Sequence, residues 1–172
     1  MNRKRIDKKR FDEQFRRLFA QKEDPGVVYG QFDMEYLPLD AKPYFIIQLL
    51  LSFREISHIT YRVVFWENND RMISFMESNL SDRQYSLTTF YKGRESPGII
   101  YIEDKRVDDI FLAEILKNHF NYEMGKEPTL QMRLQICIDP PPFVILMDVY
   151  DDRGFHIYYF PSNSGELHSL AS

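Results

Sequence analysis

The sequence predicts a single α+β domain, in which a mostly antiparallel or mixed sheet of five to seven strands packs with three or four helices. Its 172 residues are 44% hydrophobic and 28% charged, a composition typical of a globular chain of one-domain length. Segments of period-two alternation lie between segments whose apolar residues recur at helical spacing. We expect residues 1–22 to form a basic amphipathic helix, continuous with one domain over residues 23–172.

Two helices are predicted in the first third of the chain. Phe11, Phe15, Leu18 and Phe19 fall on one face of the first helix, which ends before the turn sequence Asp24-Pro25-Gly26. A second, buried helix is expected over residues 44–56, although the apolar period alone does not exclude a strand there. Asp40 is its predicted cap, and Pro43 falls in the first turn, where a missing amide is tolerated.

Two further helices are predicted downstream. A short helix is expected over residues 71–79. The helix over residues 107–120 has a clearer pattern, with apolar residues at helical spacing: Val107, Ile110, Phe111, Ile115 and Leu116. Asp108 and Asp109 lie in its first turn, where the helix dipole favours negative charge.

The clearest strand signal is the alternation over residues 130–138. One face carries Leu130, Met132, Leu134, Ile136 and Ile138, and the other carries Gln131, Arg133, Gln135, Cys137 and Asp139. The prolines at 140–142 cannot donate ladder hydrogen bonds, so they should end this strand. The continuously apolar residues 143–147 predict a central strand covered on both faces. Further strands are predicted at residues 27–36, 59–66, 85–91 and 99–102.

The segment from Asp148 to Tyr159 predicts a hairpin, two strands joined by a short turn. We expect Gly154 to adopt a positive φ there, because glycine has no Cβ to oppose that geometry. Tyr158 and Tyr159 are adjacent in the second strand and must face opposite ways, which leaves one of them available to a binding surface.

Residues 144–154 form an apolar strand that runs into a Tyr-Asp-Asp-Arg-Gly turn, and upstream the helix over residues 110–120 is followed by Gly125-Lys126-Glu127-Pro128. This combination resembles the bacterial domain-of-unknown-function family 3885, whose members end with such a strand, turn and second strand before a short helical tail. Residues 164–170 are similar to the start of that tail. The resemblance implies the α+β fold and a bacterial cytosolic setting, and it carries no activity.

Charge is distributed unevenly along the chain. The net charge is -4, but residues 1–22 hold nine Lys or Arg and three Asp or Glu, a net of +6. The remaining residues hold 22 - 9 = 13 basic and 26 - 3 = 23 acidic side chains, a net of -10. An acidic body repels nucleic-acid phosphates and favours a cationic protein partner.

Several features predict a cytoplasmic protein without a membrane span. The longest nearly apolar run, residues 44–51, is far shorter than the ~20 residues that cross a bilayer. Charged residues follow the basic N-terminus at positions where a secretory signal needs an apolar stretch. The single cysteine, Cys137, allows no intrachain disulfide, which fits a reducing compartment.

The candidate binding residues are those of the hairpin turn, because they are expected on a rigid tip beside several tyrosines: Tyr150, Asp151, Asp152, Arg153 and Gly154. Alternatively, Asp148, Asp151 and Asp152 could hold a hard cation such as Mg²⁺. Their spacing lacks the pattern of a calcium loop, however, and Asp and Arg in a hairpin turn commonly serve as turn formers and a surface ion pair.

Recognisable catalytic and cofactor motifs are absent from the sequence. It contains no Gly-x-Ser-x-Gly elbow, phosphate-binding glycine loop or dinucleotide fingerprint. The histidines His58, His119, His156 and His168 lack the spacing of a zinc site. Cys137 is expected to be inert, since no activating base is visible. We therefore expect no cofactor and no metal.

These observations predict a non-enzymatic protein-binding module, most concretely an immunity-type protein that neutralises a cationic toxin. Two alternatives remain. One is a metal-assisted hydrolase that uses the acidic hairpin turn. The other is nucleic-acid binding through the basic arm, residues 3–10, which is disfavoured because the arm lacks interleaved aromatic residues and the rest of the chain is acidic.

Overall fold

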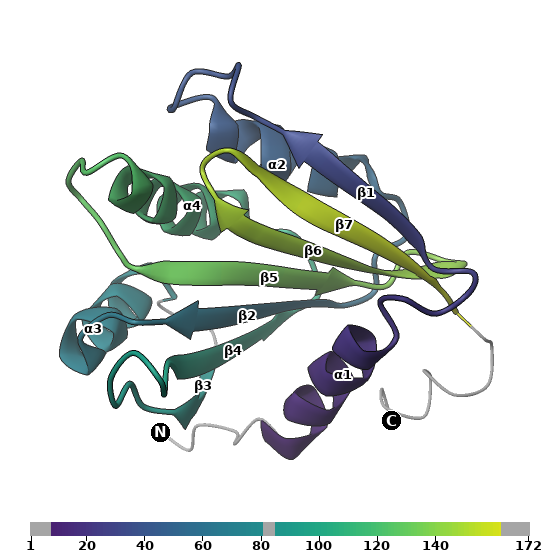
Figure 1. Cartoon of the computed structure of the whole chain (residues 1–172), viewed down its shortest axis with the longest axis horizontal. Coiled ribbons are helices and arrows are strands. Elements are labelled where there is room, and N and C mark those ends of the chain that lie inside the picture. The colour runs from purple at the N-terminus through teal and green to yellow at the C-terminus, as the bar shows by residue number, and fades with distance from the viewer. Residues whose placement is uncertain (1–7, 81–84, 163–172) are drawn as a thin grey trace.

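The computed structural model describes residues 8–80 and 85–162, and within them seven strands form one antiparallel sheet (Figure 1). The strand order is β1-β7-β6-β5-β2-β4-β3. The strands are β1 (Val28–Asp33), β2 (Ile59–Phe65), β3 (Tyr85–Thr89), β4 (Gly98–Asp104), β5 (Met132–Ile138), β6 (Phe143–Asp151) and β7 (Gly154–Pro161). The predicted α+β class and the predicted number of strands are confirmed.

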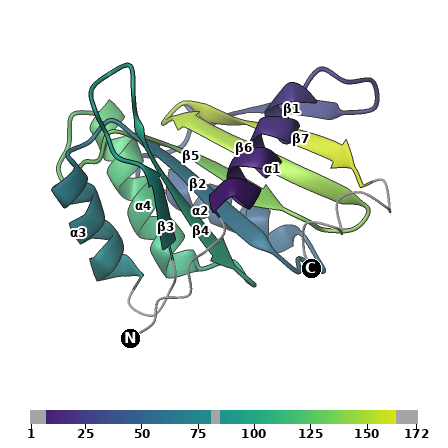
Figure 2. The same cartoon turned by 90° about the horizontal axis from the view of Figure 1, so that it is seen from below.

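Three helices cover one face of the sheet and one helix crosses the other, as Figures 1 and 2 show together. The first group comprises α2 (Lys42–Ser52), α3 (Asn69–Asn79) and α4 (Asp109–Glu123), and α1 (Lys8–Ala20) lies alone on the opposite face. Most of the predicted basic arm and the predicted helical tail at residues 164–170 lie outside the described residues.

The larger core lies between the sheet and α2, α3 and α4. Alternate strand residues such as Val63, Leu134 and Met147 point into it and are fully buried. β6 is an interior strand whose residues from Val144 to Val149 are buried on both faces, so the prediction of a strand covered on both sides is confirmed.

The smaller core lies under α1. Phe11, Phe15 and Leu18 are buried there against side chains that include Leu146 and Cys137, so the predicted amphipathic face is confirmed. These contacts fall near the end of the sheet where β6 begins and β5 ends. The other end of this sheet face carries polar and aromatic side chains, which form the candidate site described below.

Two details of the predicted helices are wrong. Asp40 does not cap α2, because a turn from the amide of Ala41 to the carbonyl of Pro38 leaves Ala41 in the cap position, with no side-chain hydrogen bond. Ile110 is 75% exposed instead of buried. Asp108 caps α4 through the amide of Phe111, and this start turns Phe111 toward the sheet and Ile110 to solvent.

Candidate binding surface

A row of polar side chains crosses the sheet on the face that carries α1. Its members lie directly opposite one another on adjacent strands: Gln31 with His156, His156 with Asp148, Asp148 with Gln135, Gln135 with Arg62, and Arg62 with Tyr101. Because opposed residues of paired strands point to the same face, all six side chains share the α1 side.

Hydrogen bonds connect this row and tie it to α1. Arg62 donates from Nη1 to Oε1 of Gln135 (2.6 Å) and from Nε to the hydroxyl of Tyr101 (3.2 Å). That hydroxyl donates to Oδ1 of Asp12 on α1 (2.7 Å). Burial and the bond to Asp12 raise the pKa of Tyr101 to about 12, so the phenol keeps the proton that it donates.

Asp148 is the most deeply buried charge of the row, with 1% of its side chain exposed. Arg133 binds it in a bidentate manner, with Nε 2.7 Å from Oδ1 and Nη2 2.6 Å from Oδ2. Gln135 adds a bond to Oδ1, and the ammonium of Lys22 lies 3.9 Å from Oδ2. The hydrogen bonds to Asp148 raise the pKa of Arg133. The carboxylate is thus surrounded by donors and acts as a fixed anchor for the strands.

Beside this anchor lies an aromatic group that we call the tyrosine cluster: Tyr29, Tyr150, His156 and Tyr158. The ring centre of Tyr29 lies 5.5 Å from His156 and 5.1 Å from Tyr158, and that of Tyr150 lies 4.7 Å from His156. These residues come from the adjacent strands β1, β6 and β7. Tyr29 is 51% exposed, so part of the cluster faces solvent.

Tyr158 and its neighbour Tyr159 face opposite ways, as predicted. Tyr159 packs against the larger core, and Tyr158 lies on the α1 side in the tyrosine cluster. The ammonium of Lys22 lies 4.6 Å from the ring centre of Tyr158, a cation–π geometry. The ammonium of Lys22, two residues after the end of α1, therefore already lies against the tyrosine cluster.

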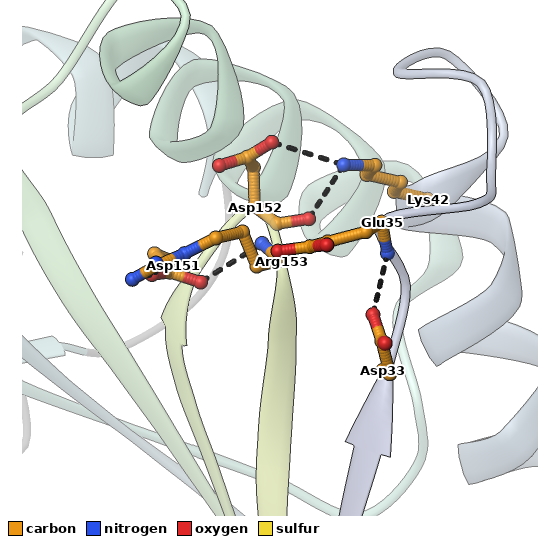
Figure 3. Close-up of polar contacts among 6 residues, drawn as sticks. All are labelled: Asp33, Glu35, Lys42, Asp151, Asp152 and Arg153. Atoms are coloured by element: carbon orange, nitrogen blue, oxygen red, sulfur yellow. Dashed lines mark hydrogen bonds and ion pairs between the residues drawn. The ribbon is translucent and has the colours of Figure 1, made fainter.

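The predicted hairpin tip is held by its own ion pairs (Figure 3). Asp151 accepts hydrogen bonds from the amide (2.8 Å) and Nε (2.7 Å) of Arg153. Lys42 of α2 donates to the backbone oxygen (2.6 Å) and to Oδ2 (2.9 Å) of Asp152. The amide of Met34, just after β1, donates to the backbone oxygen of Arg153. The tip is thus fastened to both β1 and α2.

Gly154 begins β7, but not with the predicted positive φ. The positive-φ glycines of the described residues are Gly26, Gly93 and Gly125. A Cβ at Gly154 would instead overlap the backbone oxygen of Phe32 on β1. The prediction of positive φ is wrong, and glycine is required here because β1 approaches β7 closely.

The three aspartates considered as metal ligands each form an ion pair with a different basic side chain. Asp148 pairs with Arg133, Asp151 with Arg153, and Asp152 with Lys42. Among residues 8–80 and 85–162, no group of three or more His, Cys, Asp or Glu side chains is placed to hold a metal ion. Ion pairs therefore hold the turn. Four of the five predicted tip residues stabilise the hairpin and its contacts with β1 and α2: Asp151, Asp152, Arg153 and Gly154.

One buried histidine lies near the tip, and the sequence shows only that it lacks the spacing of a zinc site. His119 on α4 is fully buried, and burial lowers its pKa to about 4 against the opposing attraction of Asp151 and Asp152. Burial and the same two carboxylates raise the pKa of Glu123, one turn further along α4. These contacts join α4 to a hairpin distant in sequence, so spacing alone gives no signal for them.

A pocket of about 530 Å³ lies on the other side of the molecule, between α2 and α4. Its polar lining includes the carboxylates of Asp40 and Glu114 together with the lysines Lys117 and Lys126. The charged side chains of this lining are thus two carboxylates and two ammonium groups.

Cys137 lies beneath α1 and accepts a hydrogen bond from Nε2 of Gln14 (3.5 Å). Burial raises the pKa of its thiol to about 12. Since the thiolate is the nucleophilic form, this cysteine carries no chemistry near neutral pH.

Comparisons with family models, curated proteins and solved structures found no match to the chain. The resemblance to family 3885 accordingly remains a prediction. No helix of the described residues is long and apolar enough to cross a membrane.

Proposed function

We propose that this chain is a non-enzymatic protein-binding module, most concretely an immunity-type protein that binds and neutralises a cationic toxin. The observation that carries the proposal is the tyrosine cluster on the part of the sheet that α1 leaves uncovered. Tyrosine and arginine are enriched in protein interfaces and among the residues that dominate binding energy. The cluster offers three tyrosines, and the charge of Arg133 acts on one of them, Tyr158.

The rigidity of this surface supports the proposal. The cluster stands on three hydrogen-bonded strands, and the bidentate pair between Arg133 and Asp148 fixes the strands next to it. Tyr150 also accepts a hydrogen bond from Nε2 of Gln31 (3.4 Å). A surface ordered in this way loses little conformational entropy on binding, so more of the contact energy contributes to affinity.

The charge of the chain supports the choice of a cationic partner. Residues 23–172 carry a net charge of -10. The electrostatic field of this negative charge accelerates the association of a basic protein, and added salt weakens that field by screening.

The test is a calorimetric titration with the product of the gene next to this one, at about 50 mM and about 300 mM salt. We expect binding that weakens with salt. Tyr29→Ala should lower the affinity by about tenfold or more, because it removes an exposed ring from the cluster.

Tyr44→Ala is the matched control, since Tyr44 is 61% exposed but lies on α2, behind the sheet. It should bind as the unaltered protein does. A failure to associate at low salt would remove the toxin-neutralising proposal, and equal losses from the two substitutions would show that the tyrosine cluster is not the interface.

A further inference from the structure

Among residues 8–80 and 85–162, no strand pairs with the outer edge of β1, so its outward backbone groups have no ladder partner there. β1 is the end strand of the sheet and pairs only with β7 among the described strands (Figure 1). The amide of Met34 donates to the backbone oxygen of Arg153, the hairpin-tip residue opposite it, so the backbone groups of Met34 point toward the hairpin of β6 and β7. Backbone groups alternate in an antiparallel pair, and those of Tyr29, Gln31 and Asp33 therefore point away from β7.

β1 lacks three features that usually prevent an edge strand from pairing with another chain. Its six residues include no lysine and no proline, and their register with β7 is continuous, without a bulge. Asp33 is its one charged residue. Val28, Tyr29 and Phe32 are all exposed. β3, the end strand on the opposite side of the sheet, does contain a register shift between Leu87 and Thr89.

The two faces of β1 differ in chemistry. Tyr29, Gln31 and Asp33 lie on the α1 side, and Val28, Gly30 and Phe32 lie on the side of the larger core. A strand added beside β1 would place its own alternate side chains against these two sets. One set offers an aromatic ring and a carboxylate, and the other offers apolar surface.

The chain around β1 is uniformly acidic. Residues 23–41 include no Lys or Arg and five exposed acidic side chains: Glu23, Asp24, Asp33, Glu35 and Asp40. The cations beside the hairpin tip, Lys42 and Arg153, are each paired with an aspartate (Figure 3). The edge is therefore complementary to a basic segment.

We propose that the β1 edge binds an extended segment of the partner as an eighth strand of the sheet. The segment carries basic side chains at alternate positions, facing Tyr29 and Asp33, and apolar side chains between them, facing Val28 and Phe32. The inference rests on the proposed function and names the part of the partner that is recognised.

A second copy of this chain fits the same edge poorly. Pairing of two β1 strands, in either direction, would bring residues 23–41 of one copy beside the same residues of the other. Each of these segments carries five acidic side chains and no Lys or Arg, so the two segments repel each other.

The test uses an acetylated heptapeptide that alternates lysine and valine, starting with lysine. Amide chemical shifts of the isotope-labelled protein should change at Tyr29, Gln31 and Asp33 on titration. A peptide of the same composition, with its four lysines followed by its three valines, should bind about tenfold more weakly, because it cannot match both faces of β1.

Two variants separate the backbone from the side chain at position 31. Gln31→Pro removes an outward amide, and edge strands tolerate proline where the amide faces solvent, so we expect a stable protein that binds the alternating peptide about tenfold more weakly. Gln31→Ala removes the same side chain, and with it the bond to Tyr150, but keeps the amide, so it should bind the alternating peptide more tightly than Gln31→Pro does. Should Gln31→Pro fail to fold, Asp33→Asn keeps a side-chain acceptor for the amide of Glu35 and should weaken binding about threefold through loss of charge.

The inference is overturned if the alternating peptide shifts no β1 amide, if both peptides bind equally, or if Gln31→Pro and Gln31→Ala behave alike. It is also overturned if the protein alone forms a dimer that Gln31→Pro abolishes, since the edge would then belong to a second copy. If the toxin-like partner still binds Gln31→Pro normally but not Tyr29→Ala, the edge inference fails and the proposed function stands.

Discussion

Gly154 is the residue at which β1 and β7 approach too closely for any side chain. An alanine there would place its Cβ against the backbone oxygen of Phe32, and backbone can yield only if the strands separate. We expect Gly154→Ala to lower the free energy of unfolding by about 1–3 kcal/mol, as overpacking does, measured by urea denaturation.

Gly30→Ala is the control for this substitution. Its added Cβ would lie 3.2 Å from Cγ2 of Ile157, a side-chain atom that can shift. The loss of stability should be clearly smaller than for Gly154→Ala, and equal losses would contradict the argument from the close backbone approach.

His119 makes stability depend on pH. Burial lowers its folded pKa from 6.5 to about 4, so between these values the unfolded chain binds a proton that the folded chain does not. This contribution to stability is present above pH 6.5 and is lost as pH falls toward 4, by about 3 kcal/mol in total. His119→Leu should therefore lose less stability than the unaltered protein between about pH 7 and about pH 4.5, measured as unfolding free energies. The same loss in both proteins would contradict a neutral, buried His119.

At the scale of elements, α1 is the cover of the smaller core. Phe15 is buried beneath it, and Cys137 lies under the same helix. Phe15→Ala should cost about 3–5 kcal/mol and let α1 open, so that Cys137 reacts faster with an aromatic disulfide reagent. Arg16→Ala alters an exposed residue of the same helix and should leave the reaction rate unchanged. An unchanged rate in Phe15→Ala would show that α1 does not control access to the thiol.

The elements themselves were largely predictable from sequence, because their signals are local. The alternation over residues 130–138 appears as β5, and the apolar spacing of Phe11, Phe15 and Leu18 appears as the buried face of α1. The errors concern positions at helix ends. There the hydrogen bonding of one turn, as at Ala41, decides which residue is the cap.

The candidate site was predictable only in part. Tyr150 is among the predicted binding residues, and the opposed directions of Tyr158 and Tyr159 follow from local pattern. The tyrosine cluster does not, because Tyr29 reaches His156 through the pairing of β1 with β7, two strands from opposite ends of the chain. Spacing within either segment contains no information about that register.

At the scale of the whole molecule, the four helices of the described residues leave one region of the sheet uncovered. α2, α3 and α4 cover one face, and α1 covers only part of the other (Figure 2). The open region joins the tyrosine cluster to the free edge of β1, both of which include Tyr29. With an acidic chain around it, this continuous surface is the place where we propose that a basic partner binds.

Amide hydrogen exchange of the protein, alone and bound to its partner, tests this account most directly. Binding should slow exchange at the outward amides of β1, at Tyr29, Gln31 and Asp33, while α2 and α4 exchange as before. Protection around the pocket between α2 and α4, with β1 unchanged, would contradict it.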